Sequence, residues 1–268
     1  MRNPVVAGQF YPGSRTALLK EIKSLVDPKA RREDAIGVIS PHAGYMYSGP
    51  VAGSVLSSIT AKSTYIIMGP NHTGLGGPFG ISAEDSWKTP LGDVQVDEKL
   101  ASQIKSNSGL VKDDDLSHSR EHSIEVQLPF LQFMQKDFKF VAITISCASL
   151  GAYRDIGKSI AKSIKELGLQ DSVTIIASSD MTHYESQEAA KRKDLIAIDA
   201  VLKLDEEKLI QSVAELDITM CGYAPVAIMI IAAKELGAKK ARLVRYETSG
   251  DVTGDYSSVV GYAGIVVD

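Results

Sequence analysis

Three of the five histidines in this sequence stand a few residues beyond an apolar run of the kind that forms a buried strand. The three strings are Ile39-Ser40-Pro41-His42, Met68-Gly69-Pro70-Asn71-His72 and Ser178-Ser179-Asp180-Met181-Thr182-His183. In open α/β sheets, ligands bind in the crevice beyond the carboxyl ends of the strands. If the three strands are parallel neighbours, their loops converge there. Each histidine alone reads as a solvated loop residue, but the set favours a shared site, because loops on a rigid sheet commonly carry function.

Proline and glycine surround the first two of these histidines, in Pro41-His42-Ala43-Gly44 and Pro70-Asn71-His72-Thr73-Gly74. Proline fixes the direction in which the chain leaves the strand, and glycine permits turns that other residues resist. Both properties would hold an imidazole in place for a metal ion. The simpler interpretation is that proline and glycine punctuate these loops as they do loops in general.

The two cysteines have different settings. Cys221 precedes a strongly apolar helix, and a helix N-terminus stabilises the thiolate that binds metal or attacks carbon. A buried structural cysteine is the equal alternative. Cys147 ends a strand among small residues and reads as a packed core thiol. Two histidines and one thiolate form a ligand set suited to Fe(II), Cu or Zn.

Asp180 lies close enough to His183 in the chain to orient the imidazole or share its proton, as a general acid–base pair requires. Alternatively, Asp180 caps a turn. The segment from Arg120 opens a predicted helix that continues through Leu131, with His122 projecting from the loop–helix junction. His118 stands beside three aspartates, and we expect it to be exposed.

Alternation of strands and helices predicts the fold that positions these residues. The expected strands are 35–40, 64–68, 138–146, 173–177, 243–248 and 257–267. The expected helices begin after Ser14 and near 187, 205 and 222, and a further helix carries Ile156, Ile160 and Ile164 and ends at Gly168. The strands are continuously apolar, which indicates a sheet covered on both faces. We therefore predict an α/β/α sandwich with a central, mostly parallel or mixed sheet in a single domain, residues 1–268.

Composition narrows the classes of function. The chain has 268 residues, 44% hydrophobic and 23% charged, with a net charge of −4, which gives no electrostatic footprint for nucleic acid or an anionic membrane. Two cysteines cannot form a disulfide framework. The N-terminus lacks a signal-peptide core, and the longest strictly apolar run, 226–233, is far shorter than the roughly 20 residues of a spanning helix. We expect a cytoplasmic α/β enzyme or binding protein.

Seven strings, taken together and in order, resemble the Memo family (the AmmeMemoRadiSam system protein B type) and, through it, the class III LigB-type extradiol dioxygenases. They are Gly8-Gln9-Phe10-Tyr11-Pro12, Pro41-His42-Ala43-Gly44-Tyr45 with Tyr47-Ser48-Gly49, Gly69-Pro70-Asn71-His72, Glu121-His122-Ser123-Ile124-Glu125-Val126-Gln127-Leu128-Pro129, Ser178-Ser179-Asp180-Met181-Thr182-His183, Cys221-Gly222 and Gly261-Tyr262-Ala263. The resemblance implies one LigB-like domain with a metal pocket at one edge of the sheet. It assigns His42, His72 and Cys221 as metal ligands and His183 as the catalytic histidine, with Asp180 beside it and His122 in the same pocket.

One departure from the dioxygenases bears on activity. They use two histidines and a carboxylate, whereas here the third position is Cys221, so ring cleavage does not follow from the resemblance. The implied cofactor is one transition-metal ion per chain, Fe(II) or Cu, with Zn as a third option. Memo proteins are described in metal handling, redox chemistry and phosphopeptide-linked signalling, and microbial members are often encoded beside AMMECR1-like and radical-SAM partners.

Three functions compete. The leading hypothesis is a metal-dependent oxidoreductase in which His183 exchanges protons with a small-molecule or peptide ligand. The second is a module that retains the pocket and binds metal or peptide without turnover, which the cysteine in place of a carboxylate favours. The third is a metal-free hydrolase with Cys221 as nucleophile, which leaves His42 and His72 without a role.

Overall fold

Four parallel strands form the centre of the sheet, and each of them is one of the expected apolar runs. In sheet order they are β1 (Gly37–Ser40), β8 (Val173–Ser178), β2 (Thr64–Pro70) and β7 (Lys139–Ile145). The computed structural model describes residues 1–268. Every residue of β1, β2 and β8 is buried, which is why these runs are apolar throughout and not alternating.

The remaining strands make the sheet mixed. Beside β1 lies β11 (Val259–Val267), antiparallel to it, and then β10 (Ala241–Thr248) at the edge. Beyond β7 lie β3 (Phe79–Ile81), antiparallel to β7, and β6 (Lys112–Asp113). The other pairings are those of β5 (Gly92–Val96) with β7 and with β4 (Ser86–Thr89), and of β9 (His183–Glu185) with the end of β11.

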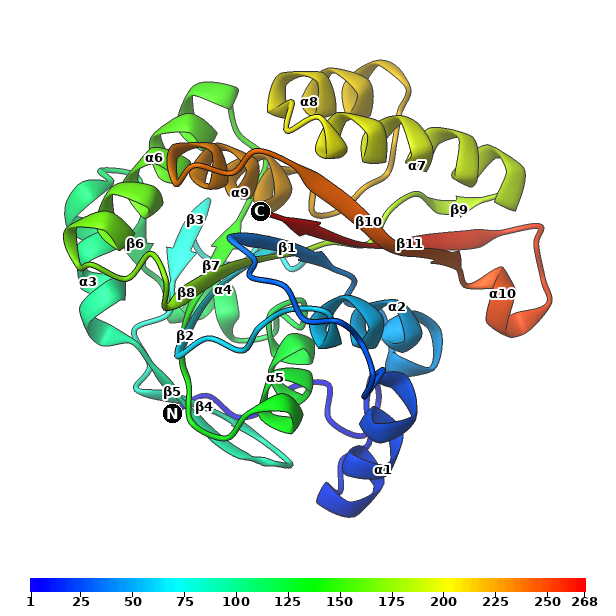
Figure 1. Ribbon diagram of the computed structural model, residues 1–268, viewed down its shortest axis with the longest axis horizontal. Helices are drawn as coiled ribbons and strands as arrows, with labels where there is room; N and C mark the ends of the chain where they lie inside the picture. Colours follow the sequence, from blue (N-terminus) through cyan, green and yellow to red (C-terminus); the bar gives the residue numbers. More distant parts are fainter.

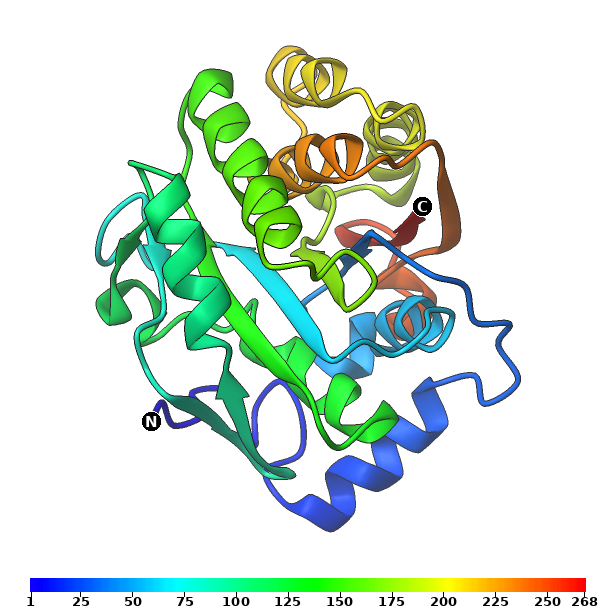
Figure 2. The ribbon, with the colours of Figure 1, turned by 60° about the vertical axis from the view of Figure 1, so that its left-hand side comes forward.

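Helices cover both faces of this sheet (Figure 1, Figure 2). One face carries α3 (Glu98–Asn107), α6 (Leu150–Glu166), α7 (Gln187–Leu202), α8 (Glu206–Glu215) and α9 (Tyr223–Glu235). The other carries α1 (Arg15–Leu25), α2 (Tyr45–Ser57) and α5 (Leu128–Met134), with short α4 (Asp115–His118), η1 (Glu125–Gln127) and α10 (Gly250–Thr253) at the periphery. The α/β/α sandwich with a mixed sheet is therefore confirmed. No helix combines the length and apolar character needed to cross a membrane.

Alternate residues of β2 supply the two apolar layers. Ile66 and Met68 belong to the 42-residue cluster under α6 and α9, and Tyr65 and Ile67 to the 26-residue cluster under α1, α2 and α5. This is the period of two that side chains follow along a strand. The core thus consists of two apolar layers, one on each face of the sheet. Packing on both faces holds each strand in place and so sets where the loop after it begins.

Several elements differ from the sequence-based expectation. Nothing was expected between Gly69 and Ser119, where the structure has β3, β4, β5, α3, β6 and α4. The helix α2 also escapes prediction, because it contains Pro50 and five glycines and serines, residues of low helix propensity. Its glycines serve packing: a Cβ on Gly53 would lie 2.2 Å from the carbonyl oxygen of Leu25, so α1 can approach only a bare backbone.

The predicted helix from Arg120 begins later than expected, at Glu125 as η1. The carboxylate of Glu121 accepts hydrogen bonds from the backbone N–H groups of His122 and Ser123, at 2.9 Å each. A side chain that satisfies local backbone donors competes with helix formation. The segment that carries His122 is therefore a tight loop and not a helical turn.

Candidate metal centre

The pocket lies where three parallel strands end. His42 follows β1, His72 follows β2, and Asp180 and His183 follow β8, and these strands are parallel neighbours in the sheet. All four side chains line a cavity of about 710 Å³, together with His122 from the loop before η1. The structure thus brings together the four histidines that the sequence analysis placed at the site.

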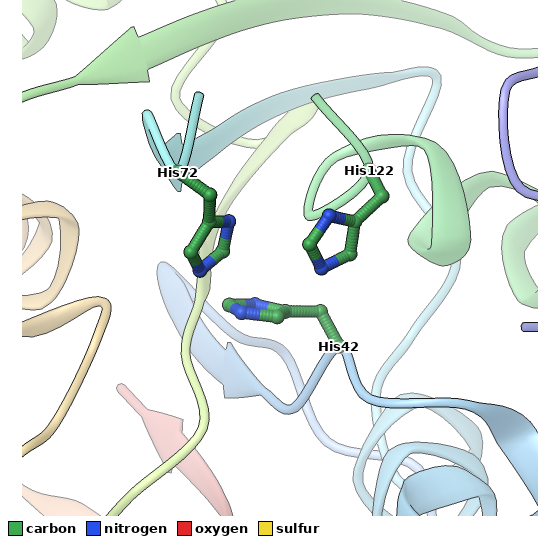
Figure 3. A group of neighbouring side chains, drawn as sticks. All are labelled: His42, His72 and His122. Carbon is green, nitrogen blue, oxygen red and sulfur yellow. The ribbon is translucent and has the colours of Figure 1, made fainter. Parts of the chain in front are cut away.

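His42, His72 and His122 form the tightest group. Each offers a ring nitrogen, and these three atoms lie within 4.8 Å of one another. Figure 3 shows the three rings pointing into a common space from three different loops. The rings of His72 and His122 stack at a centroid distance of 4.8 Å, and His42 meets both edge-on, at 5.1 and 5.5 Å.

The hydrogen bonds of Ser178 fix the tautomer of His42. The Ser178 hydroxyl donates its only hydrogen to the carbonyl oxygen of Ser123, at 2.6 Å, so it can only accept from other groups. It accepts from the amide of Gln127 at 2.9 Å, and its 2.9 Å contact with His42 Nδ1 must be an Nδ1–H donor bond. The lone pair of His42 is therefore on Nε2.

Glu121 fixes His72 in the same way. Its carboxylate is fully buried and accepts from both Nδ1 and the backbone N–H of His72, at 2.9 and 2.7 Å. Burial would raise the pKa of Glu121, but the hydrogen bond and charge of His72 and the surrounding backbone donors lower it to about 2. Burial likewise opposes protonation of His72, and Glu121 overcomes it, so the pKa of His72 rises. The Nε2 atom of His72 is left with the lone pair, and the carboxylate–histidine pair is an arrangement common around protein metals.

The other two imidazoles of the group stay neutral. Burial lowers the pKa of His42 well below its ordinary value, and the neighbouring His72 and His122 lower it further. Burial also lowers the pKa of His122, against the charge of Glu121. Neutral imidazoles are the form that binds metal.

His183 is oriented by Thr219 and not by Asp180. Its Nδ1 lies 2.9 Å from the carbonyl oxygen of Thr219, which can only accept, so Nδ1 carries the proton and Nε2 is free. Asp180 instead accepts the backbone N–H of His42 at 2.7 Å. Burial raises the pKa of Asp180 to about 6, against the backbone donors that lower it.

Cys221 lies behind His42, just before α9. Its Sγ is 3.2 Å from His42 Nε2 and accepts the backbone N–H of Asp180 at 3.3 Å. Burial raises the pKa of the Cys221 thiol, and the charge of Asp180 raises it further. Both effects favour the thiol form and outweigh the stabilisation that a helix N-terminus gives to a thiolate.

Two sequence-based expectations outside the pocket are wrong. His118, expected at the surface, is 1% exposed, because its ring packs edge-on against Trp87 and its Nε2 lies 3.0 Å from the carbonyl oxygen of Gly80. Burial lowers its pKa to about 4. Cys147, expected in the core, is exposed, and the hydroxyl of Tyr223 donates to its sulfur at 3.1 Å.

The positioning residues Glu121, Ser178 and Gln127 were missed as such, although all three stand in the quoted strings. An acidic residue directly before His122 is a signal in the sequence, but it contacts His72, which only the fold reveals. A second missed feature is the N-terminal segment. Arg2 is buried and donates to the Glu125 carboxylate at 2.8 Å and to the carbonyl oxygens of His118 and Glu121 at 2.8 and 2.6 Å.

Comparison with known proteins identifies the family of this chain. The family model described as Memo-like protein matches residues 2–266. A MEMO1 family protein from Methanococcoides burtonii is 46% identical, with 100% of both chains covered, and one from Pyrobaculum aerophilum is 43% identical over 99% of this chain and 98% of the relative. Among solved structures, the uncharacterized protein JW3007 from Escherichia coli K12 has a TM-score of 0.58 at 11% identity, covering 86% of this chain and 98% of that one. The last likeness concerns the fold alone.

Proposed function

The chain belongs to the Memo family, and from that premise we propose that its pocket binds one transition-metal ion and serves a metal-dependent oxidoreductase reaction. One observation carries the proposal. The hydrogen bonds to Ser178 and Glu121 place the protons of His42 and His72 on Nδ1 and leave a lone pair on each Nε2, and one ring nitrogen from each of His42, His72 and His122 lies within 4.8 Å of the other two. A group of packed histidines without such partners would have no reason to share this tautomer.

The donor set fits a transition metal. Neutral imidazoles suit Fe(II), Cu and Zn, and a set that leaves coordination positions free can also accept a substrate. When bound, the ion would supply Lewis acidity and, for iron or copper, one-electron chemistry. Glu121 would hold the His72 ring in place, and its lowered pKa keeps the carboxylate charged beside the ion.

His183 is proposed as the proton-exchanging group. Its Nε2 is free, its Nδ1 proton is held by the carbonyl oxygen of Thr219, and the ring lines the same cavity as the three other histidines. An imidazole fixed in this way can take a proton from a bound substrate and return it. Asp180, buried behind His42, would stabilise positive charge that develops in the pocket.

The third ligand has two candidates, and a separate observation favours each. His122 belongs to the group whose nitrogens lie within 4.8 Å, and burial lowers its pKa, which favours the neutral ring. Cys221 lies 3.2 Å from His42 Nε2, which makes it the thiolate alternative, at the cost of releasing its proton when metal binds. The three-histidine set is the primary proposal, because it requires no deprotonation of a buried thiol.

Metal affinities of matched variants separate the two sets. Zn²⁺ and Cu⁺ affinities would be measured anaerobically by chelator competition for His122→Ala, Cys221→Ser and, as the pocket control, His183→Ala. The three-histidine set predicts a loss of about 100-fold or more in Zn²⁺ affinity for His122→Ala and little change for Cys221→Ser. The reverse order would transfer the third position to sulfur. His183→Ala should retain metal and lose any turnover, and loss of metal would show that His183 is a ligand.

A further inference from the structure

The pocket has an unusual charge balance. Of the seventeen residues that line it, none is Lys or Arg, whereas two are aspartates, Asp180 and Asp255. Asp255 lies on the loop between α10 and β11, and only its Oδ1 is occupied, by the N–H and hydroxyl of Ser257 at 2.9 and 2.6 Å. Sites for phosphate or carboxylate groups commonly use Arg or Lys side chains, and this pocket has neither.

Aromatic side chains form much of the remaining wall, namely Phe10, Tyr47, Tyr184 and Tyr262. Tyr262 is 2% exposed and lines the cavity, and its hydroxyl makes no hydrogen bond within the chain. A hydroxyl that lines a cavity without a partner in the chain is free to hydrogen-bond with a bound ligand.

Tyr184 combines an exposed aromatic ring with an uncommon backbone conformation. Its ring is 78% exposed at the pocket, and its backbone has φ of 61°, in the left-handed region that side chains rarely adopt. It directly follows His183, so the same backbone conformation that presents this ring sets the path of the His183 loop. Residues in this backbone region cluster at active sites and ligand sites, and of the three non-glycine residues with positive φ in the chain only Tyr184 lines the pocket.

We propose that the substrate of this pocket is a small organic cation, an amine on an aromatic or apolar body. The body would lie among Phe10, Tyr47 and Tyr184, whose ring faces attract cations. The amine would lie toward the free carboxylate oxygen of Asp255, and a hydrogen-bond acceptor on the body would receive the hydroxyl of Tyr262. The proposal rests on the proposed function for the inner, metal-binding end of the pocket, and it adds the chemical class bound at the outer end.

A pair of probes that differ only in charge tests this class. Tyramine and 3-(4-hydroxyphenyl)propionate share the phenol and the two-carbon chain and end in an amine and a carboxylate. Binding of each to the Zn²⁺-loaded protein would be measured by calorimetry. We expect tyramine to bind at least about tenfold more tightly. Equal binding, or tighter binding of the carboxylate, would overturn the proposal.

Variants locate the two contacts. Asp255→Asn keeps the oxygen that accepts from Ser257. It should weaken the binding of tyramine about three- to tenfold and leave the binding of 3-(4-hydroxyphenyl)propionate unchanged or tighter. Asp93→Asn, the same charge change on an exposed residue of β5 outside the pocket, should alter neither. Tyr262→Phe should weaken both probes by a similar factor. Unchanged tyramine affinity in Asp255→Asn would overturn the placement of the amine.

Metal affinity, measured on the same samples, keeps the two proposals apart. Protein that binds Zn²⁺ and prefers the carboxylate contradicts the substrate class alone. Protein that binds no Zn²⁺ contradicts the proposed function, whatever its preference between the probes.

Discussion

Two glutamates of one loop, Glu121 and Glu125, are equally inaccessible to solvent, at 0% exposure each, and face opposite regions of the molecule. Glu125 faces the N-terminal segment, where it receives the guanidinium of Arg2 at 2.8 Å and the hydroxyl of Tyr11 at 2.7 Å. Glu121 faces the pocket, where it receives the ring and backbone of His72.

The difference between the two regions lies in the partner. Arg2 is permanently charged, so Glu125 is in a closed ion pair that can serve only the fold. His72 can lose a proton and still donate from Nδ1, so Glu121 is paired with a group that keeps a lone pair for another ligand. Residue type and burial are identical, and the partner alone separates a structural carboxylate from a positioning one. Each prediction below acts on one side of this comparison.

The largest effect is expected on the structural side. Arg2→Met removes a buried cation that contacts Glu125, two carbonyl oxygens and the face of Trp87 at 4.0 Å. Because it leaves a buried carboxylate without its countercharge, the free energy of unfolding should fall by about 3–5 kcal/mol in urea denaturation. The exposed Arg31→Met is the control and should cost less than about 0.5 kcal/mol. A loss below about 1 kcal/mol for Arg2→Met would contradict the structural role.

His118, whose carbonyl oxygen accepts from Arg2, gives the same region a pH dependence. Its pKa is about 4 in the folded protein and about 6.5 when unfolded, so the unfolded chain binds more protons between these values. The neutral His118 therefore contributes fully to the free energy of unfolding above pH 6.5. As the pH falls to 4, this contribution is lost, and the free energy of unfolding decreases by about 3 kcal/mol. The stability difference between wild type and His118→Phe should shrink by that amount over this range. A difference independent of pH would disprove the buried neutral imidazole.

The third prediction concerns the site side of the comparison. Glu121→Gln removes the charge that orients His72 and should lower metal affinity about 10- to 100-fold, because partners of metal-bound histidines act at this scale. Glu125→Gln is the matched control: it should lower stability while leaving metal affinity within about threefold of wild type. Equal effects of both variants on metal affinity would remove the distinction between the two carboxylates.

The cysteines give the smallest expected effect. Cys147 is exposed, whereas burial and the charge of Asp180 raise the pKa of the Cys221 thiol. Without metal, iodoacetamide should therefore modify Cys147 at least about tenfold faster than Cys221, as peptide mass spectrometry would measure. Faster modification of Cys221 would indicate the accessible thiolate that the helix N-terminus alone predicts.

The sequence was sufficient for the fold class and for the meeting of His42, His72 and His183, because apolar runs and parallel strand ends are local signals. It was insufficient for the partners that orient them. Ser178 and Glu121 act through residues distant in sequence, such as Gln127 and His72, and only the register of the sheet brings these together. The sequence does not predict the burial of His118 for the same reason. Its neighbours in sequence are acidic, but its neighbours in space are Trp87 and Gly80.

The central claim is that this pocket holds one metal ion through His42 and His72. The most direct measurement is the metal content of protein loaded with Zn²⁺ and passed through gel filtration, for wild type and His72→Ala, with His118→Phe as a histidine control outside the pocket. We predict about one ion per chain for wild type and the control, and about a tenth or less for His72→Ala. Wild type without retained zinc, or His72→Ala with the wild-type content, would contradict the claim.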